Sequence, residues 1–358
     1  MKKRIIGIDV ARALAVIGMI IVNFKIVFGQ HGDEWLKTFA HFFEGKAAAT
    51  FVVLAGVGLA FMTNTAVNNQ DQKKLKTAQK KILKRALFLF VIGLSYISIW
   101  PADILHFYGI YMLLALLFVG RKTNQILAGV IVIILLFPIL LILFDYENGW
   151  NFTTLEYPDF WTFEGFFRNL FYNGFHSVFP WTAFMLFGLW YGKQDLTNNH
   201  FVKKSFWISL ITFIIIQLIS YGLIYFLANG NSSTIIELTP ILGTDPMPPM
   251  PIYMLNGIAI SIVTISGCIL LARRYEKSFI INILNKTGQL ALTFYLAHVI
   301  IGMGLIEELG AQDFGNYSIQ FSVTYALGFS FCCTVFAVVW LKYKKSGPLE
   351  WIMRKITT

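Results

Sequence analysis

Charged residues are scarce in this sequence. Asp, Glu, Lys and Arg make up 13% of its 358 residues, while 56% are hydrophobic and the mean hydropathy is +0.64. Soluble domains carry about 25% charged residues. Cysteine is also scarce, and Cys268, Cys332 and Cys333 all lie inside apolar segments. These shortages exclude an external disulfide framework and a zinc-ligand spacing, and they predict an exterior that faces lipid.

The motifs of several enzyme classes are absent as well. The chain has no Walker loop, no nucleophile elbow, no HExxH and no dinucleotide-binding glycine fingerprint. ATP hydrolysis, zinc proteolysis and hydride transfer therefore have no support, and no metal is expected. The net charge of +10 does not predict a nucleic-acid partner, because the basic residues form short clusters between apolar runs.

Long apolar runs dominate what is present. A helix needs about 20 apolar residues to cross the hydrocarbon core of a bilayer, where it must satisfy its own backbone polar groups. Ten runs predict spans, of which 179–192 is the shortest: 8–28, 47–65, 84–100, 103–120, 124–144, 179–192, 205–228, 251–272, 287–307 and 318–341. The expected fold class is all-α, a polytopic integral membrane bundle of about ten transmembrane helices. Trp100-Pro101 predicts a tight hairpin between two of them.

The basic residues predict the orientation of this bundle. Of the 29 Lys and Arg residues, 24 lie in the first four residues or in the segments 66–85, 121–122, 193–204, 273–286 and 342–358. Cytoplasmic segments carry the excess of Lys and Arg in membrane proteins. We therefore expect these segments, and with them both termini, to be cytoplasmic. No small-residue cleavage site follows the first apolar run, so the basic N-terminus is interpreted as the flank of a span.

The same topology predicts three outer loops, at 29–46, 145–178 and 229–250. The second is rich in aromatic residues and is expected to lie along the membrane interface or over the outer mouth. The third is rich in Gly, Ser and Pro and is expected to lack regular secondary structure. The basic cytoplasmic loop 66–85 includes Lys80 and Lys81. It either faces anionic lipid or attracts a polyanionic cosubstrate.

Polar residues in the first predicted span, where each is costly, include Asp9, Arg12 and Asn23. Arg12 and Asn23 are eleven residues apart, or about three helical turns, so they share one face. One interpretation is structural, with Asp9 and Arg12 paired and Asn23 hydrogen-bonded across helices. The other is a polar stripe that serves a ligand.

Histidines gather towards the predicted outer side. They are His31 and His41 in the first outer loop, His106 behind Asp103, and His176 ahead of the sixth span, with His298 in the middle of the ninth. A single histidine is more often structural than catalytic. Several near one membrane face, with carboxylates nearby, favour a site that moves protons.

Five stretches of the sequence carry a resemblance to known families. GIDVARALAVIGMIIVNF (7–24) resembles the first span of membrane-embedded acyltransferases, and its Arg with Asn eleven positions later is similar to heparan-α-glucosaminide N-acetyltransferase. Four others resemble the YeiB-like family of bacterial membrane proteins: FFEGKAAATFVVLAGVGLAF (42–61), RNLFYNGFHSVFPWTAFMLFGLWYG (168–192), TGQLALTFYLAH (287–298) and SGPLEWIMRKIT (346–357). The resemblance covers nearly the whole chain. It implies one transmembrane acyltransferase-like domain over residues 1–358 and a place in the bacterial cytoplasmic membrane.

The resemblance also implies an activity, with acyl-CoA as a cytosolic cosubstrate and an acceptor that arrives from outside. In the N-acetyltransferase relatives an outer-loop histidine, in a pattern like H-x-x-W-x-G, is catalytic. Its nearest counterpart here is His41 in HFFEG, one residue short and with Phe in place of Trp, and His31 competes for the role. Asn23 and Arg12 match the Asn and Arg of the family.

The leading hypothesis is transfer of an acyl group, with acetyl the first candidate, to an extracytoplasmic amine or hydroxyl. His41 or His176 would be the general base, Asn23 would orient the acyl carbonyl or the base, and His106 would shape the outer pocket. The anionic cosubstrate would be held by Arg12, Lys80 and Lys81. The expected partners are membrane lipid, the CoA thioester and the acceptor, and a homodimer is an assembly that the sequence allows. Two alternatives stay open, a transporter of a small anionic or amphipathic solute and a noncatalytic membrane partner.

Overall fold

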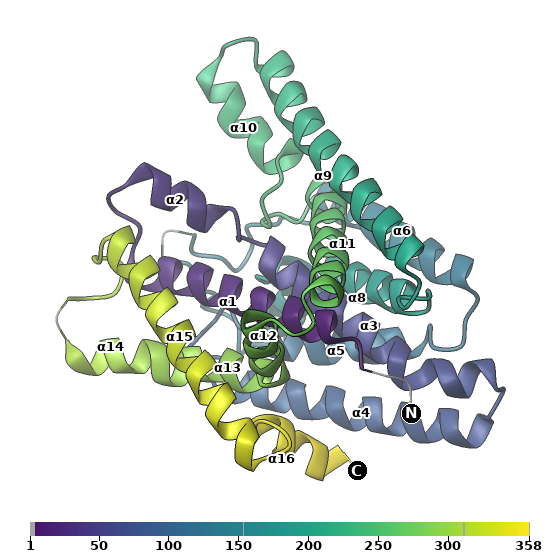
Figure 1. Ribbon diagram of the computed structural model, residues 1–358. Coiled ribbons are helices and arrows are strands. Elements are labelled where there is room, and N and C mark those ends of the chain that lie inside the picture. Colours follow the sequence, from purple (N-terminus) through teal and green to yellow (C-terminus); the bar gives the residue numbers. More distant parts are fainter. Residues whose placement is uncertain (1–3, 153, 311, 358) are drawn as a thin grey trace. The chain divides into compact units, whose positions relative to one another are not determined.

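The computed structural model describes residues 4–152, 154–310 and 312–357, and in this part of the chain it is helical with no strand (Figure 1). The all-α prediction is confirmed. The helices have the following bounds: α1 Ile6–Phe28, α2 Glu34–His41, α3 Lys46–Asn68, α4 Gln72–Ser95, α5 Leu105–Leu116, α6 Thr123–Leu143, α7 Phe163–Arg168, π-helix η1 Asn169–Asn173, α8 Val178–Gly192, α9 Asn199–Ala228, α10 Ser232–Leu242, α11 Pro251–Arg274, α12 Phe279–Gln289, α13 Ala291–Ala297, π-helix η2 His298–Met303, α14 Gly304–Leu309, α15 Ile319–Tyr343 and α16 Pro348–Thr357.

Seven helical stretches of the described residues are long and apolar enough to cross a membrane. They include α1, α6, α9, α11 and α15, and the described chain thus has the make-up of a multi-pass membrane protein. Every one of the ten predicted spans contains a helix, but α4 begins with a basic stretch, and α5 and α8 have only 12 and 15 residues. At 1.5 Å per residue, these last two are shorter than a hydrocarbon core of about 30 Å. The count of ten spans stays a prediction.

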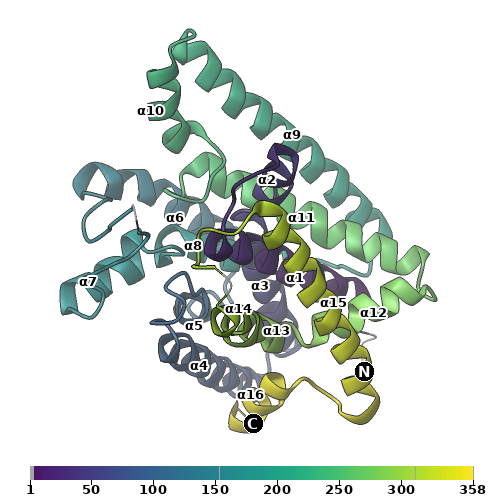
Figure 2. The ribbon, with the colours of Figure 1, turned by 90° about the vertical axis from the view of Figure 1, so that its left-hand side faces the viewer.

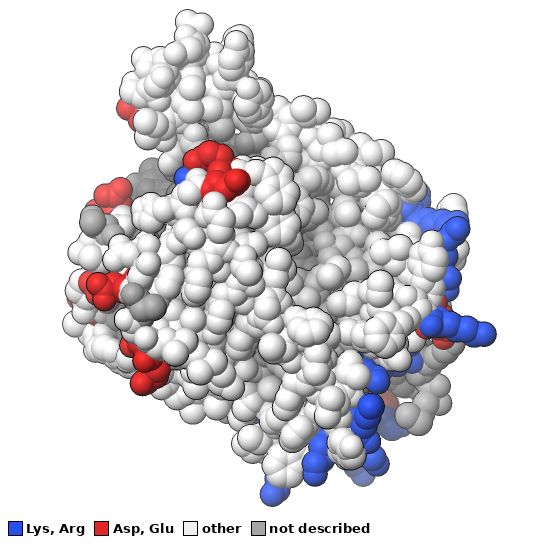
Figure 3. Space-filling model, turned by 60° about the vertical axis from the view of Figure 1, so that its left-hand side comes forward, with Lys and Arg blue, Asp and Glu red and all other residues white. Residues whose placement is uncertain are grey.

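The surface agrees with a lipid-facing exterior. On the face drawn in Figure 3, charged side chains gather in clusters and leave wide areas without a charge. Helices α6 and α9 expose many large apolar side chains, for example Ile142 and Phe226, at 83% and 78% exposed. Such continuous apolar surface is rare on soluble proteins and is expected against lipid.

The chain forms two compact units. Unit 1 comprises Met1–Phe51, Thr197–Trp207 and Ser261–Ile356, and unit 2 comprises Val52–Leu196, Ile208–Ile260 and the last two residues. In unit 1, helices α12, α13 and α15 pack against α1 (Figures 1 and 2). Gly288 of α12 permits this close approach, because a Cβ atom there would lie 1.8 Å from the carbonyl oxygen of Asp9.

Unit 2 contains the predicted hairpin at Trp100-Pro101, formed by α4 and α5. The two helices meet where Gly93 lies against the backbone of His106, and a Cβ atom on Gly93 would lie 2.3 Å from the His106 amide nitrogen. A small residue at such a crossing lets two helices approach to backbone contact. The hairpin prediction is confirmed.

The segment 229–250 corrects one prediction, because it contains the eleven-residue helix α10. The side chain of Asn231 accepts a hydrogen bond from the Ser233 amide at 2.9 Å and starts the helix. Pro240 lies near the end of α10 and does not prevent it. The basic segment 66–85 is also mostly helical rather than a loop, since α3 ends at Asn68 and α4 starts at Gln72. Lys and Gln are good helix formers, and Asp71 caps α4 by accepting from the Lys74 amide.

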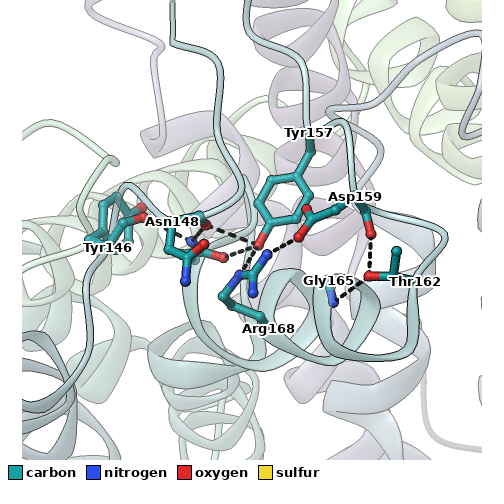
Figure 4. A network of polar contacts seen from close by, with 8 residues as sticks. Tyr146, Asn148, Tyr157, Asp159, Thr162, Gly165 and Arg168 are labelled. Carbon is teal, nitrogen blue, oxygen red and sulfur yellow. Dashed lines mark hydrogen bonds and ion pairs between the residues drawn. The ribbon is translucent and has the colours of Figure 1, made fainter.

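Within the aromatic segment 145–178, the described residues make polar contacts with one another (Figure 4). Arg168 pairs with Asp159 and donates through Nε to the Tyr157 hydroxyl at 2.8 Å. That hydroxyl donates to Asn173 Oδ1 at 2.9 Å, and Asn173 Nδ2 donates to the carbonyl oxygens of Tyr146 and Asn148, both at 2.8 Å. Since one fully buried amide joins distant parts of the segment, its conformation is specified by the chain itself.

Candidate functional site

The N-terminal end of α1 holds an ion-pair cluster in unit 1. Asp9 is 2% exposed and accepts from Arg4 Nε and from Arg12 Nη1, each at 2.6 Å. The predicted i,i+3 pair of Asp9 and Arg12 is confirmed. Because Asp9 and Arg12 lie on the same helix and pair directly, part of the Arg12 charge is already balanced within α1.

Asn23, near the other end of α1, pairs with a histidine of unit 1. Its Nδ2 atom lies 2.8 Å from Nε2 of His298, which is fully buried on the π-helix η2. An amide nitrogen only donates, so Nε2 accepts and the neutral ring carries its proton on Nδ1. The expected hydrogen bond of Asn23 across helices is thus present. Single-turn π-helices occur frequently at functional sites, because they place a side chain where a regular helix would not.

His41 belongs to a hydrogen-bonded chain of three side chains in unit 1. Its Nδ1 lies 2.8 Å from Glu44 Oε2, and Glu44 Oε1 accepts from the buried ammonium of Lys25 on α1. The His41 ring is 50% exposed, so a molecule outside can reach it. Burial raises the pKa of Glu44, which lies in the turn between α2 and α3, but the hydrogen bonds from His41 and Lys25 outweigh it and the pKa is lowered. An ionised carboxylate at Nδ1 orients the imidazole and stabilises its protonated form.

The structure does not bring Asn23 and His41 into one cluster. Asn23 and Lys25 are two residues apart on α1, which is about 200° around the helix. The Asn23–His298 pair and the Lys25–Glu44–His41 chain therefore lie on different faces of α1. Sequence reasoning noted His298 and Glu44 only as positions or parts of motifs, although both lie in stretches with family resemblance, 287–298 and 42–61.

Two further candidate histidines, His106 and His176, come together in unit 2. Asp103 is fully buried, and it accepts from the Tyr96 hydroxyl, from the His106 amide at 3.1 Å and from the His106 ring through Nδ1 at 3.0 Å. The His176 ring lies 4.6 Å from that of Trp181. Among the residues that the structure describes, His106 Nε2 and His176 Nδ1 have no hydrogen-bond partner. Unit 2 thus holds a second polar cluster within an aromatic environment.

The electrostatics of His176 bear on its candidacy as a base. Burial lowers the pKa of its ring from 6.5 to about 3, and the charge of Asp103 only partly opposes this. At neutral pH the ring is uncharged and a weak base. Of the two histidines considered for proton abstraction, His41 has the more suitable surroundings.

The remaining candidates lie apart from these clusters. His31 is exposed, and its carbonyl oxygen accepts from the Ile319 amide at 2.8 Å. Lys80 is exposed and Lys81 half-buried on α4 of unit 2, whereas Arg12 belongs to unit 1. Within the described residues no group of three or more His, Cys, Asp or Glu side chains is placed to hold a metal ion.

Unit 1 also has a small cavity beside the N-terminal end of α1. Its volume is about 210 Å³, and two arginines that sequence reasoning passed over, Arg4 and Arg273, line it together with Glu276. Gly7, Thr197 and Ile269 also line the cavity. Ligand pockets commonly measure about 300–1,000 Å³, so this cavity suits a fragment of a larger molecule.

The fold and these clusters define a multi-pass α-helical membrane protein with ionisable side chains at both ends of its first helix. Residues 4–228 match the family model for heparan-alpha-glucosaminide N-acetyltransferase, catalytic, and residues 191–358 match one for a protein of unknown function, DUF418. The first match covers more than half of the chain, and the chain belongs to this transmembrane acetyltransferase family. The resemblance inferred from the motifs is confirmed. No curated protein and no solved structure gave a significant match.

Proposed function

We propose that this protein is a membrane-embedded acyltransferase. It moves an acyl group, with acetyl the leading candidate, from cytosolic acyl-CoA to an amine or hydroxyl on the outer side of the membrane, for example on a glycan. The observation that carries the proposal is the Lys25–Glu44–His41 chain in a member of an N-acetyltransferase family. It presents a half-exposed imidazole with an ionised carboxylate at one nitrogen, as a general base requires.

In the proposed reaction, His41 Nε2 takes the proton from the acceptor amine or hydroxyl while the acceptor attacks the thioester carbonyl. The tetrahedral intermediate collapses, the carbon–sulfur bond breaks, and His41 returns the proton to the departing CoA thiolate. Glu44 stabilises the imidazolium that forms in between, and Lys25 keeps Glu44 ionised and in place. General-base catalysis of this kind is worth about 10²–10⁴-fold in rate.

The other candidate residues have supporting roles in this proposal. Asn23 orients the acyl carbonyl or stabilises its oxyanion, together with His298 to which it is bonded. His106 and His176 shape an outer pocket in unit 2. In unit 1, Arg12 and the cavity with Arg4 and Arg273 contact phosphates of acyl-CoA; in unit 2, Lys80 and Lys81 attract its negative charge.

The proposal includes a topology. The termini and the basic segment 66–85 are cytoplasmic, the segment 145–178 is external, and the protein resides in a bacterial cytoplasmic membrane, where a homodimer is an accessible assembly. The distribution of Lys and Arg supports this orientation. The donor then arrives where the cell makes it, and the acceptor arrives on the opposite side.

The first test measures donor binding. Purified protein in detergent is titrated with acetyl-CoA by calorimetry at low and high salt, and we expect an affinity that falls as salt rises, because the phosphates meet basic side chains. If millimolar acetyl-CoA produces neither heat of binding nor a thermal shift, the proposal that the protein is an acyltransferase is contradicted.

The second test measures transfer. Proteoliposomes receive acetyl-CoA with glucosamine as an amine probe, and release of the CoA thiol is followed. His41→Ala is expected to lower the rate about 10²–10⁴-fold. Lys37→Ala is the matched control, since Lys37 lies on the same short helix and its side chain pairs with the exposed Glu34. Equal loss in both variants would show that His41 acts through the fold of the loop.

A transporter of a small anionic solute is the second candidate, favoured by the hydrogen bond between half-buried Asn23 and buried His298 inside a spanning region. Such a pair could carry protons along a translocation path. The same proteoliposomes distinguish the two, because a transporter accumulates solute without releasing thiol from acetyl-CoA.

A further inference from the structure

Two family-resembling stretches that are far apart in the sequence meet in unit 1. Residues 287–298 form the end of α12 and all of α13, and residues 346–357 form α16 with the turn before it. The first stretch ends at His298, the partner of Asn23. The function proposed above assigns no role to the second stretch, so its contacts require a separate explanation.

Glu350 makes the central contact. It is 8% exposed, and its Oε1 accepts from the amides of Leu292 and Thr293 at 2.9 and 3.1 Å. Its Oε2 accepts from the Thr293 hydroxyl at 2.6 Å. Those amides belong to the first turn of α13, whose N–H groups have no partner within the helix. A carboxylate from another helix thus satisfies the start of α13.

The contact is reciprocal. The Leu349 amide, in the first turn of α16, donates to the Thr293 hydroxyl oxygen at 3.2 Å. Each helix therefore supplies a cap for the other. Gly347 permits the arrangement, because a Cβ atom there would lie 2.1 Å from Glu350 Oε2 and 2.9 Å from the Thr293 hydroxyl. We refer to Leu292, Thr293, Leu349 and Glu350 as the α13–α16 junction.

The course of the chain on both sides of α13 gives this junction its importance. Before α13, Leu290 departs from helical geometry with φ −110° and ψ 22°, so the hydrogen-bond ladder of α12 does not continue into it. After α13, the π-helix η2 begins at His298. The seven-residue helix α13 therefore lies between a break in helical geometry at Leu290 and the π-helix η2, and contacts at its first turn help to set its rotation about its own axis.

We propose that Glu350 is a positioning residue for the Asn23–His298 pair. By capping α13 it fixes the rotation and axial position of the helix that leads into His298, the first residue of η2, seven residues and about 10 Å beyond Ala291. The C-terminal helix α16 is thereby part of the machinery of the site although it is remote from it. The catalytic consequence rests on the proposed acyl transfer, whereas the capping itself does not.

Hydrogen exchange tests the capping without any assay of activity. In purified full-length protein, Glu350→Ala is expected to speed amide exchange in peptides covering 291–303 by about tenfold or more, the change that a loss of about 1.4 kcal/mol produces. Lys355→Gln, on the same helix and also losing one charge, should leave these peptides unchanged. Equal exchange in wild type and Glu350→Ala would overturn the inference, whatever the protein catalyses.

A second pair of variants covers the case that Glu350→Ala does not fold. Thr293→Val removes the hydroxyl at nearly constant volume, and Thr293→Ser retains it. We expect faster exchange over 291–303 in the valine variant and wild-type exchange in the serine variant. The same exchange in both would contradict the proposed junction.

Turnover then tests the link to His298. In the wild-type background, Glu350→Ala should lower kcat about tenfold; in a His298→Gln background it should lower kcat less than about twofold, because residues that act through one another are not additive. Equal losses in both backgrounds would refute the positioning role. If the wild-type protein transfers no acyl group, the proposed function fails, and the exchange experiment still decides whether Glu350 holds α13.

Discussion

Replacement of Asn23 by Leu separates a catalytic role of this amide from a structural one. The side chain makes one hydrogen bond to a fully buried ring, Nδ2 to His298 Nε2 at 2.8 Å. Leu has the same branched arrangement of side-chain heavy atoms as Asn and suits a spanning helix, but it cannot donate a hydrogen bond. The substitution therefore removes one donor and little else.

The expected cost in stability is small. Interhelical hydrogen bonds in membrane proteins contribute about 0.6 kcal/mol on average, and a buried acceptor that loses its donor costs about 1–3 kcal/mol. Contacts of the apolar Leu side chain with lipid or protein offset part of this loss of stability. A net loss of about 1 kcal/mol lowers the melting temperature by a few degrees. Loss of an oxyanion donor, in contrast, costs about 10²–10³-fold in kcat.

Both quantities are measured on one preparation, as the melting temperature in detergent and the rate of thiol release in proteoliposomes. Asn64→Leu is the matched control, since Asn64 on α3 also donates one hydrogen bond, to the Gly192 carbonyl at 3.0 Å. We expect similar small shifts in melting temperature for the two variants and a loss of turnover in Asn23→Leu alone. A destabilised Asn23→Leu with wild-type turnover would refute the reasoning and leave Asn23 as a contact between helices.

Two further predictions concern topology and pH. In a background without native cysteine, Trp150→Cys should react with an impermeant maleimide on intact cells and Gln70→Cys should not, because the excess of Lys and Arg predicts that position 70 is cytoplasmic; the reverse labelling would invert the topology. For His176, the pKa near 3 in the folded state lies below the ordinary 6.5, so the unfolded chain binds the proton first and stability falls as pH drops from about 6.5 towards 3. The slope from this residue approaches about 1.4 kcal/mol per pH unit, and His176→Gln should flatten the pH dependence of the melting temperature over that range. An unchanged slope would show that the ring is protonated without cost in the folded protein.

The sequence predicted elements better than it predicted their partners. The long apolar runs around residues 8–28 and 318–341 were placed correctly, because a spanning helix is specified by local composition. The hairpin at Trp100-Pro101 and the Asp9–Arg12 pair were also correct, since both depend on neighbours along the chain. The helix α10 was missed, because a local cap by Asn231 outweighed the Gly, Ser and Pro around it.

Contacts between distant segments were beyond sequence reasoning. The sequence indicated that Asn23 orients the acyl carbonyl or a histidine base, or bonds across helices, but it did not name a partner. The tertiary structure pairs Asn23 with His298 and joins His41 to Glu44 and Lys25. In the sequence, Glu350 had no assigned role beyond its place in the family-resembling stretch 346–357. Its role follows from contacts with residues 57 and 58 positions earlier in the chain.

By itself, the sequence determined the all-α class, the positions of the long apolar helices and the asymmetry of basic residues that predicts their orientation. These properties are local, because each spanning helix satisfies its own backbone hydrogen bonds and each basic cluster favours the cytoplasmic side for its own segment. The tertiary structure alone decided which polar side chains meet, on which face of α1, and what covers the start of α13. Helix rotation and packing determine those contacts, and they depend on close approaches, such as that of Gly288 to Asp9, which no single segment of the chain encodes.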